Sequence, residues 1–204
     1  EIVIRSKSML KGYYKNPGAY EEKVKGGWFH TGDFGYIDQE NRLTVIDRIE
    51  DMRELRTGTK FSPQFTEIRL RFSPYIKDGL TLGGKDRDFV SAIINIDFEN
   101  VGKWAEARHI AYTTFVDLSQ KEQVYDLIQQ YIQRINKVVP EGARIKKFVN
   151  LHKEFDADEA ELTRSRKIRR SFVEERYANL INAIYSDMDQ IVIDAPVTYR
   201  DGRT

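Results

Sequence analysis

The sequence contains no cysteine, which excludes a disulfide scaffold and any thiol chemistry. This absence fits a reducing compartment, and we expect a cytoplasmic protein. The three histidines, His30, His109 and His152, lie far apart in the sequence and lack the spacing of metal ligands. We therefore expect no metal site among the residues of this chain.

Long apolar runs are also absent, since no stretch approaches the roughly 20 apolar residues that a membrane-spanning helix needs. The opening EIVIRSKSML is interrupted by charges and precedes no small-residue cleavage site, so it does not form a signal peptide. The chain begins inside a predicted strand and without an initiator Met. We therefore expect it to be a piece of a longer protein.

Charge of one sign is not in excess either. The 33 Lys and Arg residues nearly balance the 32 Asp and Glu residues, and the net charge of +1 predicts no general attraction to nucleic acid or anionic lipid. With 40% hydrophobic and 32% charged residues, the 204-residue chain has the composition of a globular protein with one or two compact domains.

Hydrophobic patterns divide the chain into a β-rich beginning and a mixed remainder. Alternation and turn residues predict short strands at 1–5, 28–38 and 42–48, with a turn at Asn16-Pro17-Gly18. The change in pattern places a boundary near 48–51.

Beyond this boundary, strands and helices alternate irregularly. After a predicted turn at Thr57-Gly58, Ser62 suits a helix N-cap and Pro63 suits the first helical position. The helix that follows would place four apolar residues roughly on one face: Phe65, Ile68, Leu70 and Phe72.

The rest of the chain is predicted to form a sheet with flanking helices. A helix at 119–139 is the clearest, because its apolar residues keep the spacing of one helical face: Val124, Leu127, Ile128, Tyr131, Ile132 and Ile135. The other elements are strands at 75–84, 88–97 and 144–153 and helices at 100–109 and 169–185. We predict an α+β fold: a short β-hairpin segment followed by a small mixed α/β domain with a central sheet.

Two motifs lead to no function. GLTLGGKD (79–86) has the glycines and lysine of a phosphate loop, but Asp86 replaces the Ser or Thr that binds magnesium, and a strand follows instead of a helix. A hairpin turn is the better interpretation. DADEAE (156–161) lacks the glycine and the terminal Glu of a calcium loop and is typical of a solvated acidic loop.

The basic run RSRKIRR (164–170) allows three interpretations. It is most simply a solvated helix start, which is the usual fate of a charge run. It is also compatible with a nucleic-acid patch, although the acids at 154–161 are adjacent. Thirdly, a lysine on a loop can place a compact positive charge on a reacting carboxylate and phosphate.

The segment GWFHTGDFGYID (27–38) is similarly ambiguous. Gly-Asp pairs are common in turns, because Asp bonds its own backbone and Gly adopts positive φ. Alternatively, both carboxylate oxygens of Asp33 could accept hydrogen bonds from a pair of neighbouring hydroxyls, as on a ribose. Neither segment decides the function alone.

Together, these segments resemble the C-terminal end of adenylate-forming enzymes, the superfamily of acyl-CoA synthetases, firefly luciferase and the adenylation domains of peptide synthetases. Four motifs occur in the order of that superfamily and span essentially the whole chain: KGYYKNPGAYEE (11–22), GWFHTGDFGYID (27–38), VIDRIEDMRELRTGTKFSPQFTE (45–67) and ELTRSRKIRR (161–170). The wording of the last two is most similar to that of the AMP-forming long-chain fatty acid–CoA ligases.

The resemblance implies a division of the chain at a hinge. Residues 1–49 would end the large AMP-binding domain, and residues 50–204 would form the small C-terminal domain that acts as a lid. The implied reaction joins a fatty acid to ATP, giving acyl-adenylate and diphosphate, and then transfers the acyl group to CoA with release of AMP. The phosphate loop, the magnesium-binding motif and the acid pocket would lie upstream of Glu1, so we expect the isolated chain to be inactive.

The resemblance also implies roles for individual residues. Asp33 would hold the ribose hydroxyls of the nucleotide, and Arg48 would reach the ribose and phosphates. Glu50 would be the hinge. Gly58 would line the CoA tunnel, where the missing side chain lets a thin ligand pass. Lys167 would be the catalytic lysine that bridges the carboxylate and the α-phosphate during adenylation.

One departure from the family pattern is local. Family members usually have Thr-Pro or Pro-Ser-Gly before this lysine, whereas the chain has TRSRK, with Arg164 and Arg166 in place of stiff or small residues. We expect this change to alter the flexibility of the loop.

Two other functions stay open at this point. One is an adenylate-forming enzyme for another carboxylic acid; the other is a non-enzymatic module whose basic run binds nucleic acid or anionic lipid. The near-zero net charge argues against the second, and we expect small-molecule partners and no nucleic acid. The sequence leaves open the oligomeric state and a peripheral contact with a membrane.

Overall fold

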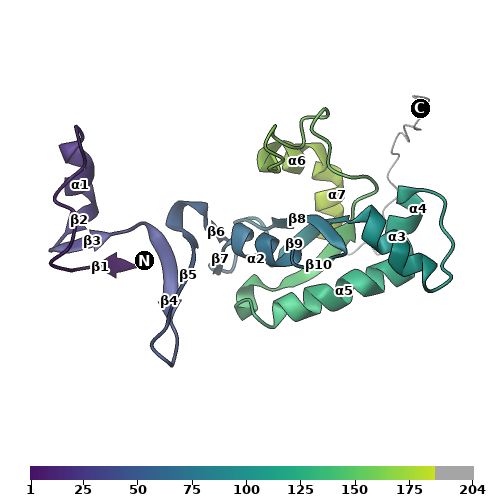
Figure 1. The fold of residues 1–204 in the computed structure, drawn as a ribbon, viewed down its shortest axis with the longest axis horizontal. Coiled ribbons are helices and arrows are strands. Elements are labelled where there is room, and N and C mark those ends of the chain that lie inside the picture. Colours follow the sequence, from purple (N-terminus) through teal and green to yellow (C-terminus); the bar gives the residue numbers. More distant parts are fainter. Residues whose placement is uncertain (187–204) are drawn as a thin grey trace.

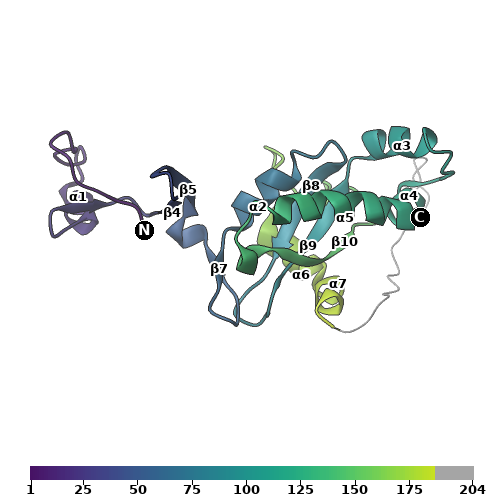
Figure 2. The same cartoon turned by 90° about the horizontal axis from the view of Figure 1, so that it is seen from below.

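The computed structural model describes residues 1–186 and is elongated. The strands of residues 1–48 form one end, and a mixed α/β body forms the other (Figures 1 and 2). Residues 187–204, the end of the predicted small domain, lie outside the described residues. No helix among the described residues is long and apolar enough to cross a membrane.

The β-rich beginning consists of a small sheet and a hairpin. The small sheet has the order β1-β3-β2 with antiparallel pairs, and β4 pairs with β5 in an antiparallel hairpin. Strands form within all three predicted ranges, but the range 28–38 holds two strands that belong to different sheets, and β2 was not predicted. The bounds are β1 Val3–Ile4, β2 Val24–Lys25, β3 Trp28–His30, β4 Asp33–Ile37 and β5 Leu43–Arg48.

The turn predicted at Asn16-Pro17-Gly18 is wrong, because these residues begin helix α1 (Pro17–Lys23). The side chain of Asn16 accepts a hydrogen bond from the backbone N–H of Ala19 at 3.3 Å and so caps the helix. Pro17 fits the first helical turn, where its missing N–H is not needed. Asn and Pro are favoured both in turns and at helix starts, and here they start a helix.

A short linker connects the two ends of the molecule. It comprises the 3-10 helix η1 (Ile49–Asp51) and the antiparallel pair β6 (Arg53–Glu54) and β7 (Lys60–Phe61). Gly58, in the predicted turn between β6 and β7, has a φ of +80°.

Helix α2 (Pro63–Leu70) begins as predicted. The Ser62 hydroxyl accepts a hydrogen bond from the N–H of Phe65 at 2.9 Å, and Pro63 occupies the first turn. The predicted apolar face is wrong: Leu70 is fully buried, whereas Phe72 is 79% exposed. Phe72 lies beyond the end of the helix, so helical spacing no longer governs its direction.

The central sheet has the order β10-β9-β8. Strand β8 (Ile76–Leu82) is antiparallel to β9 (Val90–Ile96), which is parallel to β10 (Ile145–Asn150). Every residue of β9 is buried. A strand follows the GLTLGGKD segment (79–86), so the hairpin turn is confirmed in place of a phosphate loop.

The connection from β9 to β10 is helical, as a parallel pair requires. Helix α5 (Glu122–Asn136) buries five of its six predicted apolar residues, namely Val124, Leu127, Ile128, Ile132 and Ile135. The prediction missed a short helix, α4, because its five residues are too few to show periodicity. The other elements of this connection are α3 Phe98–Glu106, α4 Phe115–Ser119 and the 3-10 helix η2 Glu141–Ala143.

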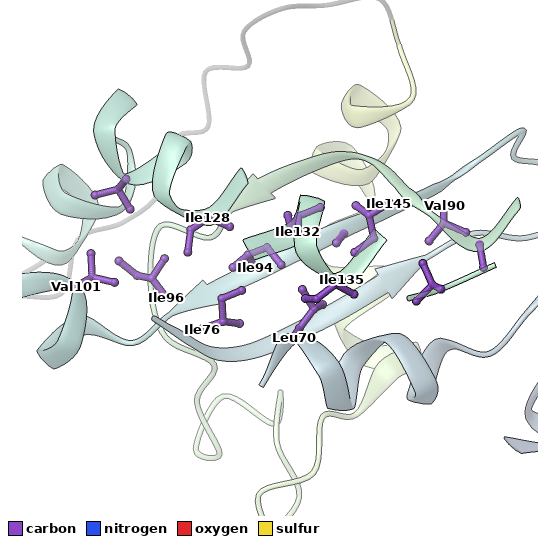
Figure 3. Close-up of a cluster of buried hydrophobic side chains, with 14 of the residues drawn as sticks. Leu70, Ile76, Val90, Ile94, Ile96, Val101, Ile128, Ile132, Ile135 and Ile145 are labelled. Carbon is purple, nitrogen blue, oxygen red and sulfur yellow. The ribbon is translucent and has the colours of Figure 1, made fainter. Parts of the chain in front are cut away.

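The two faces of the sheet carry separate cores. Ile94 belongs to the core under α2 and α5, and its neighbour Ile93 belongs to the core under the last two helices, because successive strand residues point to opposite faces. Figure 3 shows the first core, in which Leu70, Ile94 and Ile132 gather between the sheet and the helices.

The second face is covered by α6 (Arg170–Arg176) and α7 (Ala178–Ile184) (Figure 1). The predicted single helix at 169–185 is therefore interrupted. Tyr177, with φ −99° and ψ 22°, separates the two helices. Its buried ring belongs to the second core, and its hydroxyl bonds to Glu161. The predicted α+β fold, a hairpin segment followed by a mixed domain with a central sheet, is confirmed.

Candidate functional site

The β4–β5 hairpin brings together the two predicted ribose ligands. Its register places Asp33 opposite Arg48, and the Arg48 Nη1 donates to Asp33 Oδ1 at 2.7 Å and to the carbonyl of Thr31 at 3.0 Å. The hydrogen bond from Arg48 lowers the pKa of the Asp33 carboxyl, and its positive charge lowers it further. Asp33 therefore stays ionised, and Arg48 holds its Oδ1 atom. About a third of the Asp33 side chain is exposed.

The turn before Asp33 is maintained by other groups. Gly32 has a φ of +78°, and the Thr31 hydroxyl accepts a hydrogen bond from the Asp33 N–H at 3.0 Å. The same hydroxyl donates to the carbonyl of Ile2 at 2.8 Å. Thr31 thus makes the local backbone bond that an Asp often makes in such a turn, while the Asp33 carboxylate bonds to the side chain of Arg48.

The predicted hinge, Glu50, lies in the exposed 3-10 helix η1. Among residues 1–186, a single pair of side chains is hydrogen-bonded across this predicted hinge. In the described part of the chain, the only side-chain hydrogen bond between residues 1–49 and 52–186 is donated by the Ser62 hydroxyl to the Asp47 carboxylate. The orientation of the hairpin on α2 therefore depends on few polar contacts.

Gly58 lies in a tight turn between β6 and β7. Its N–H donates to the carbonyl of Leu55 at 2.9 Å, and the N–H of Leu55 donates to the carbonyl of Thr59 at 2.9 Å. A Cβ on Gly58 would meet nothing within 4 Å, so the positive φ, and not crowding, is what requires glycine here.

Lys167 closes a short turn, Thr163–Lys167. The N–H of Thr163 donates to the carbonyl of Lys167 at 2.8 Å, and the N–H of Lys167 donates to the Thr163 hydroxyl at 3.0 Å. Arg166 adopts a left-handed φ of 59° at the tip. The Lys167 side chain is exposed, and its ammonium has no hydrogen-bond or ion-pair partner among residues 1–186.

A cavity of about 520 Å³ lies between the 3-10 helix η1, which holds the predicted hinge, and this turn. Glu50 and Lys167 both line it, whereas Asp33, Arg48 and Gly58 do not. The structure therefore brings together two predicted site residues at the cavity and two on the hairpin, and it places Gly58 apart from both pairs.

The cavity also has charged residues that sequence reasoning missed. Among them are Asp47, Arg71 and Asp78. Burial raises the pKa of the Asp78 carboxyl, although Arg71, with its Nη1 at 4.0 Å, and Arg166 act in the opposite direction. No motif or spacing pointed to these residues, because they come from separate elements that only the fold brings to one wall.

The basic run 164–170 is not a continuous charged face. Arg170 points inward: its guanidinium is ion-paired with Glu67 and donates to the carbonyl of Thr81 at 2.8 Å. Arg169 donates to the carbonyl of Ala160 at 3.2 Å. This arrangement leaves Arg164, Arg166 and Lys167 as its exposed cations without such anchors, a small number for binding a polyanion.

The fold is that of the C-terminal domain of adenylate-forming enzymes. The adenylation domain of a carboxylate reductase from Mycobacterium chelonae has a TM-score of 0.57 to this chain at 22% identity, covering 91% of this chain and 27% of that one. The corresponding domain from Segniliparus rugosus, solved with AMP and a co-purified carboxylic acid, has a TM-score of 0.55 at 20% identity, covering 90% and 27%.

The chain belongs to the family described as AMP-binding enzyme C-terminal domain, whose sequence profile matches residues 50–189. It is 30% identical over 187 residues to the long-chain-fatty-acid–CoA ligase FadD15 of Mycobacterium tuberculosis, covering 91% of this chain and 31% of that protein. It is 29% identical to long chain acyl-CoA synthetase 1 of Arabidopsis thaliana, covering 91% and 28%. The chain thus spans less than a third of the length of these relatives.

Proposed function

We propose that this chain is the C-terminal part of a long-chain fatty acid–CoA ligase. Residues 1–49 end the large AMP-binding domain, and residues 50–204 form the small lid domain. One observation carries the proposal: in a chain 30% identical to FadD15 over 91% of its length, Lys167 lies on a closed turn and lines the same cavity as Glu50, the proposed hinge.

In this proposal the hairpin binds the nucleotide. The Asp33 carboxylate accepts hydrogen bonds from the two ribose hydroxyls, and the ion pair with Arg48 keeps it ionised and oriented. Arg48 also faces the ribose and phosphates. Because the two residues lie opposite each other in one antiparallel pair, the site is set by strand register and not by a flexible loop.

Lys167 serves the first half-reaction. The acid's carboxylate attacks the α-phosphorus of ATP, the bond between the α- and β-phosphates breaks, and diphosphate leaves. The Lys167 ammonium neutralises charge shared by the carboxylate and the α-phosphate, so it stabilises the transition state more than the ground state. Because the ammonium has no partner among residues 1–186, it is available for this contact.

Rotation about Glu50 then prepares the second half-reaction. The lid brings the Gly58 turn, instead of Lys167, to the acyl-adenylate, so one domain serves two chemistries. The CoA thiol attacks the acyl carbon and AMP leaves. The sparse polar contacts across the hinge, among them Ser62 to Asp47, support this movement because little has to break.

Magnesium accompanies ATP in the proposed reaction as part of the substrate. Among residues 1–186, no group of three or more His, Asp or Glu side chains is placed to hold a metal ion. The proposal therefore assigns the metal to the rest of the complete enzyme, and no step of this chain is derived through it.

The proposed substrates are all small molecules: a fatty acid, ATP and CoA. The proposal places the enzyme in the cytoplasm, which the lack of cysteine supports, with peripheral membrane contact because the acid is a lipid. It also makes the isolated chain inactive. Sustained palmitate-dependent AMP release by this chain alone would contradict that part.

The test uses the complete enzyme and separates the half-reactions. Palmitate-dependent exchange of diphosphate into ATP reports adenylation, and preformed palmitoyl-adenylate plus CoA reports thioester formation. We expect Lys167→Ala to abolish most of the exchange and largely to spare thioester formation. Unchanged exchange would refute the role of Lys167, and a panel of shorter and aromatic acids would reveal an enzyme for another carboxylic acid.

A further inference from the structure

Glu161 is a fully buried carboxylate close to the Lys167 turn, and motif reasoning gave it no role. Three donors bond to it, the Tyr177 hydroxyl at 2.6 Å, the Asp156 N–H at 2.9 Å and Lys153 Nζ at 3.0 Å, and Arg176 Nε is ion-paired with it at 3.4 Å. A buried charge is tolerated only with such a set of partners. The segment before the turn is therefore held to residues 153–156, which follow β10, and to the end of α6.

The backbone of Glu161 forms the base of the turn. Its carbonyl accepts a hydrogen bond from the N–H of Arg169 at 2.8 Å. The next pair toward the tip of the turn is a β-bridge between Leu162 and Ile168. Leu162 is buried in the second core. The residue whose carboxylate is buried thus also pairs, through its backbone, with the segment that leaves the turn.

The far side of the base is anchored independently. Arg170 is ion-paired with Glu67, which is 8% exposed, and donates to the carbonyl of Thr81 at 2.8 Å. Between these two anchors, the residues 164–167 are exposed. The turn therefore combines a rigid base with an open tip, without the proline or small residues that family members have there.

We propose that Glu161 is a positioning residue for Lys167. Its buried carboxylate fixes the base of the turn, and the base sets where the Lys167 ammonium stands during adenylation. This inference rests on the proposed function, since it assigns the support of the same site. The physical reason is that a charge acts on a transition state only from a defined position, which a freely moving loop does not supply.

The decisive variant is Glu161→Gln in the complete enzyme, because its amide keeps the size but places a donor against Lys153 and the Asp156 N–H. Tyr177→Phe is a milder second variant that removes one hydrogen bond and keeps the ring in the core. Glu159→Gln is the matched control. Glu159 contacts the same two cations, Lys153 and Arg176, but its side chain is 40% exposed, whereas that of Glu161 is fully buried, and it does not form the base of the turn.

We expect diphosphate exchange to fall about 10- to 100-fold in Glu161→Gln, as for a misplaced catalytic group. Thioester formation from preformed palmitoyl-adenylate should stay close to the wild-type rate, and Tyr177→Phe should show a smaller loss of exchange alone. Glu159→Gln should leave both steps unchanged. Equal losses in both half-reactions would mean general damage to the domain, and no loss in either step would mean that the turn needs no support; both results would overturn the proposal.

A second measurement does not depend on the reaction. Trypsin cleaves after Arg164, Arg166 and Lys167, so its rate in native conditions reports opening of the turn. We expect faster cleavage at these bonds in Glu161→Gln and the wild-type rate in Glu159→Gln. Cleavage at the wild-type rate in Glu161→Gln would overturn the proposal even if Lys167→Ala behaved as proposed. Exchange that survives Lys167→Ala would instead refute the proposed role of Lys167, and the absence of palmitate-dependent exchange in the wild-type enzyme would refute the proposed function.

Discussion

Asp33 and Arg48 are 15 positions apart in the sequence, and the β4–β5 hairpin holds their side chains at 2.7 Å, from Nη1 to Oδ1. Each therefore controls the state of the other. Arg48 lowers the pKa of Asp33 through its hydrogen bond and charge, and Asp33 raises the pKa of Arg48 for the same reasons. Two proposed nucleotide ligands thus form one electrostatic unit.

The first prediction concerns pH. With a lowered pKa, Asp33 stays ionised to a lower pH than an ordinary Asp, so nucleotide binding by the complete enzyme should persist as pH falls. Replacing Arg48 with Ala removes the largest cause of that shift. We expect the acid limb of AMP binding to move to higher pH in Arg48→Ala, as measured by calorimetric titration between about pH 3 and pH 7 around the usual Asp range. An acid limb at the same pH in both proteins would show that Asp33 does not determine it.

The second prediction separates the two roles of Ser62. Its hydroxyl accepts from the Phe65 N–H as the N-cap of α2 and donates to Asp47 of strand β5, across the predicted hinge. Ser62→Ala loses both bonds, and we expect a loss of about 1 kcal/mol in the free energy of unfolding, the usual value of a cap. Asp47→Ala keeps the cap; it removes the bond from Ser62 and the exposed hydrogen bond from the Arg48 N–H at 2.9 Å, and we expect it to cost less. Urea denaturation of the two variants measures this difference, and equal losses would contradict it.

The third prediction concerns Gly58. Its φ of +80° is strained for any other residue, although a Cβ there would meet nothing within 4 Å. We expect Gly58→Ala to destabilise the fold by about 1–2 kcal/mol. Gly18 is the matched control, because it also has open space around it but lies in α1. Gly18→Ala should stabilise by roughly 0.5–1 kcal/mol. The midpoints of thermal unfolding of the two variants should move in opposite directions, and shifts in the same direction would contradict the prediction.

The fourth prediction tests the corrected face of α2. Leu70 is fully buried against the sheet, and Leu70→Ala should cost about 2–5 kcal/mol, the range for a buried leucine. Phe72 is 79% exposed, and Phe72→Ala should change stability by less than about 0.5 kcal/mol. Chemical denaturation of both variants provides the comparison. Similar losses in the two variants would restore the face that helical spacing predicted.

Local signals predicted the elements well where one physical cause dominated. The buried face of α5 was predicted from the spacing of its apolar residues, because a single face of this helix packs on the sheet. The Ser62 cap was confirmed because Ser and Pro both favour a helix start there. Prediction failed where two causes compete. Asn16 and Pro17 suit turns and helix starts alike, and Tyr177 interrupts a helical pattern where its hydroxyl bonds to a buried carboxylate.

The residues of the candidate site likewise fall into those that the sequence named and those that only the structure showed. The motifs named Asp33, Arg48, Glu50, Gly58 and Lys167, and their roles stay predictions until the half-reactions are measured. The acidic run 156–161 was predicted to be a solvated loop, which is wrong for Glu161, because its side chain is fully buried. No sequence signal pointed to Asp78 or to the ion pair of Arg170 with Glu67, whose members are 103 positions apart. Partners at such separations carry no local pattern.

The sequence by itself determined the family, the three strands of the central sheet with the long helix α5, and the chemical groups available to a nucleotide and a carboxylate, because these depend on residue type and short spacing. Tertiary structure alone decided which charges are buried, which are paired and which stay free. Arg170 and Lys167 are three positions apart in one basic run, yet Arg170 is ion-paired against Glu67 and Lys167 is left without a partner among the described residues. The reason is that the turn's base is fixed by contacts to distant elements, and its direction sends one cation inward and leaves the other exposed.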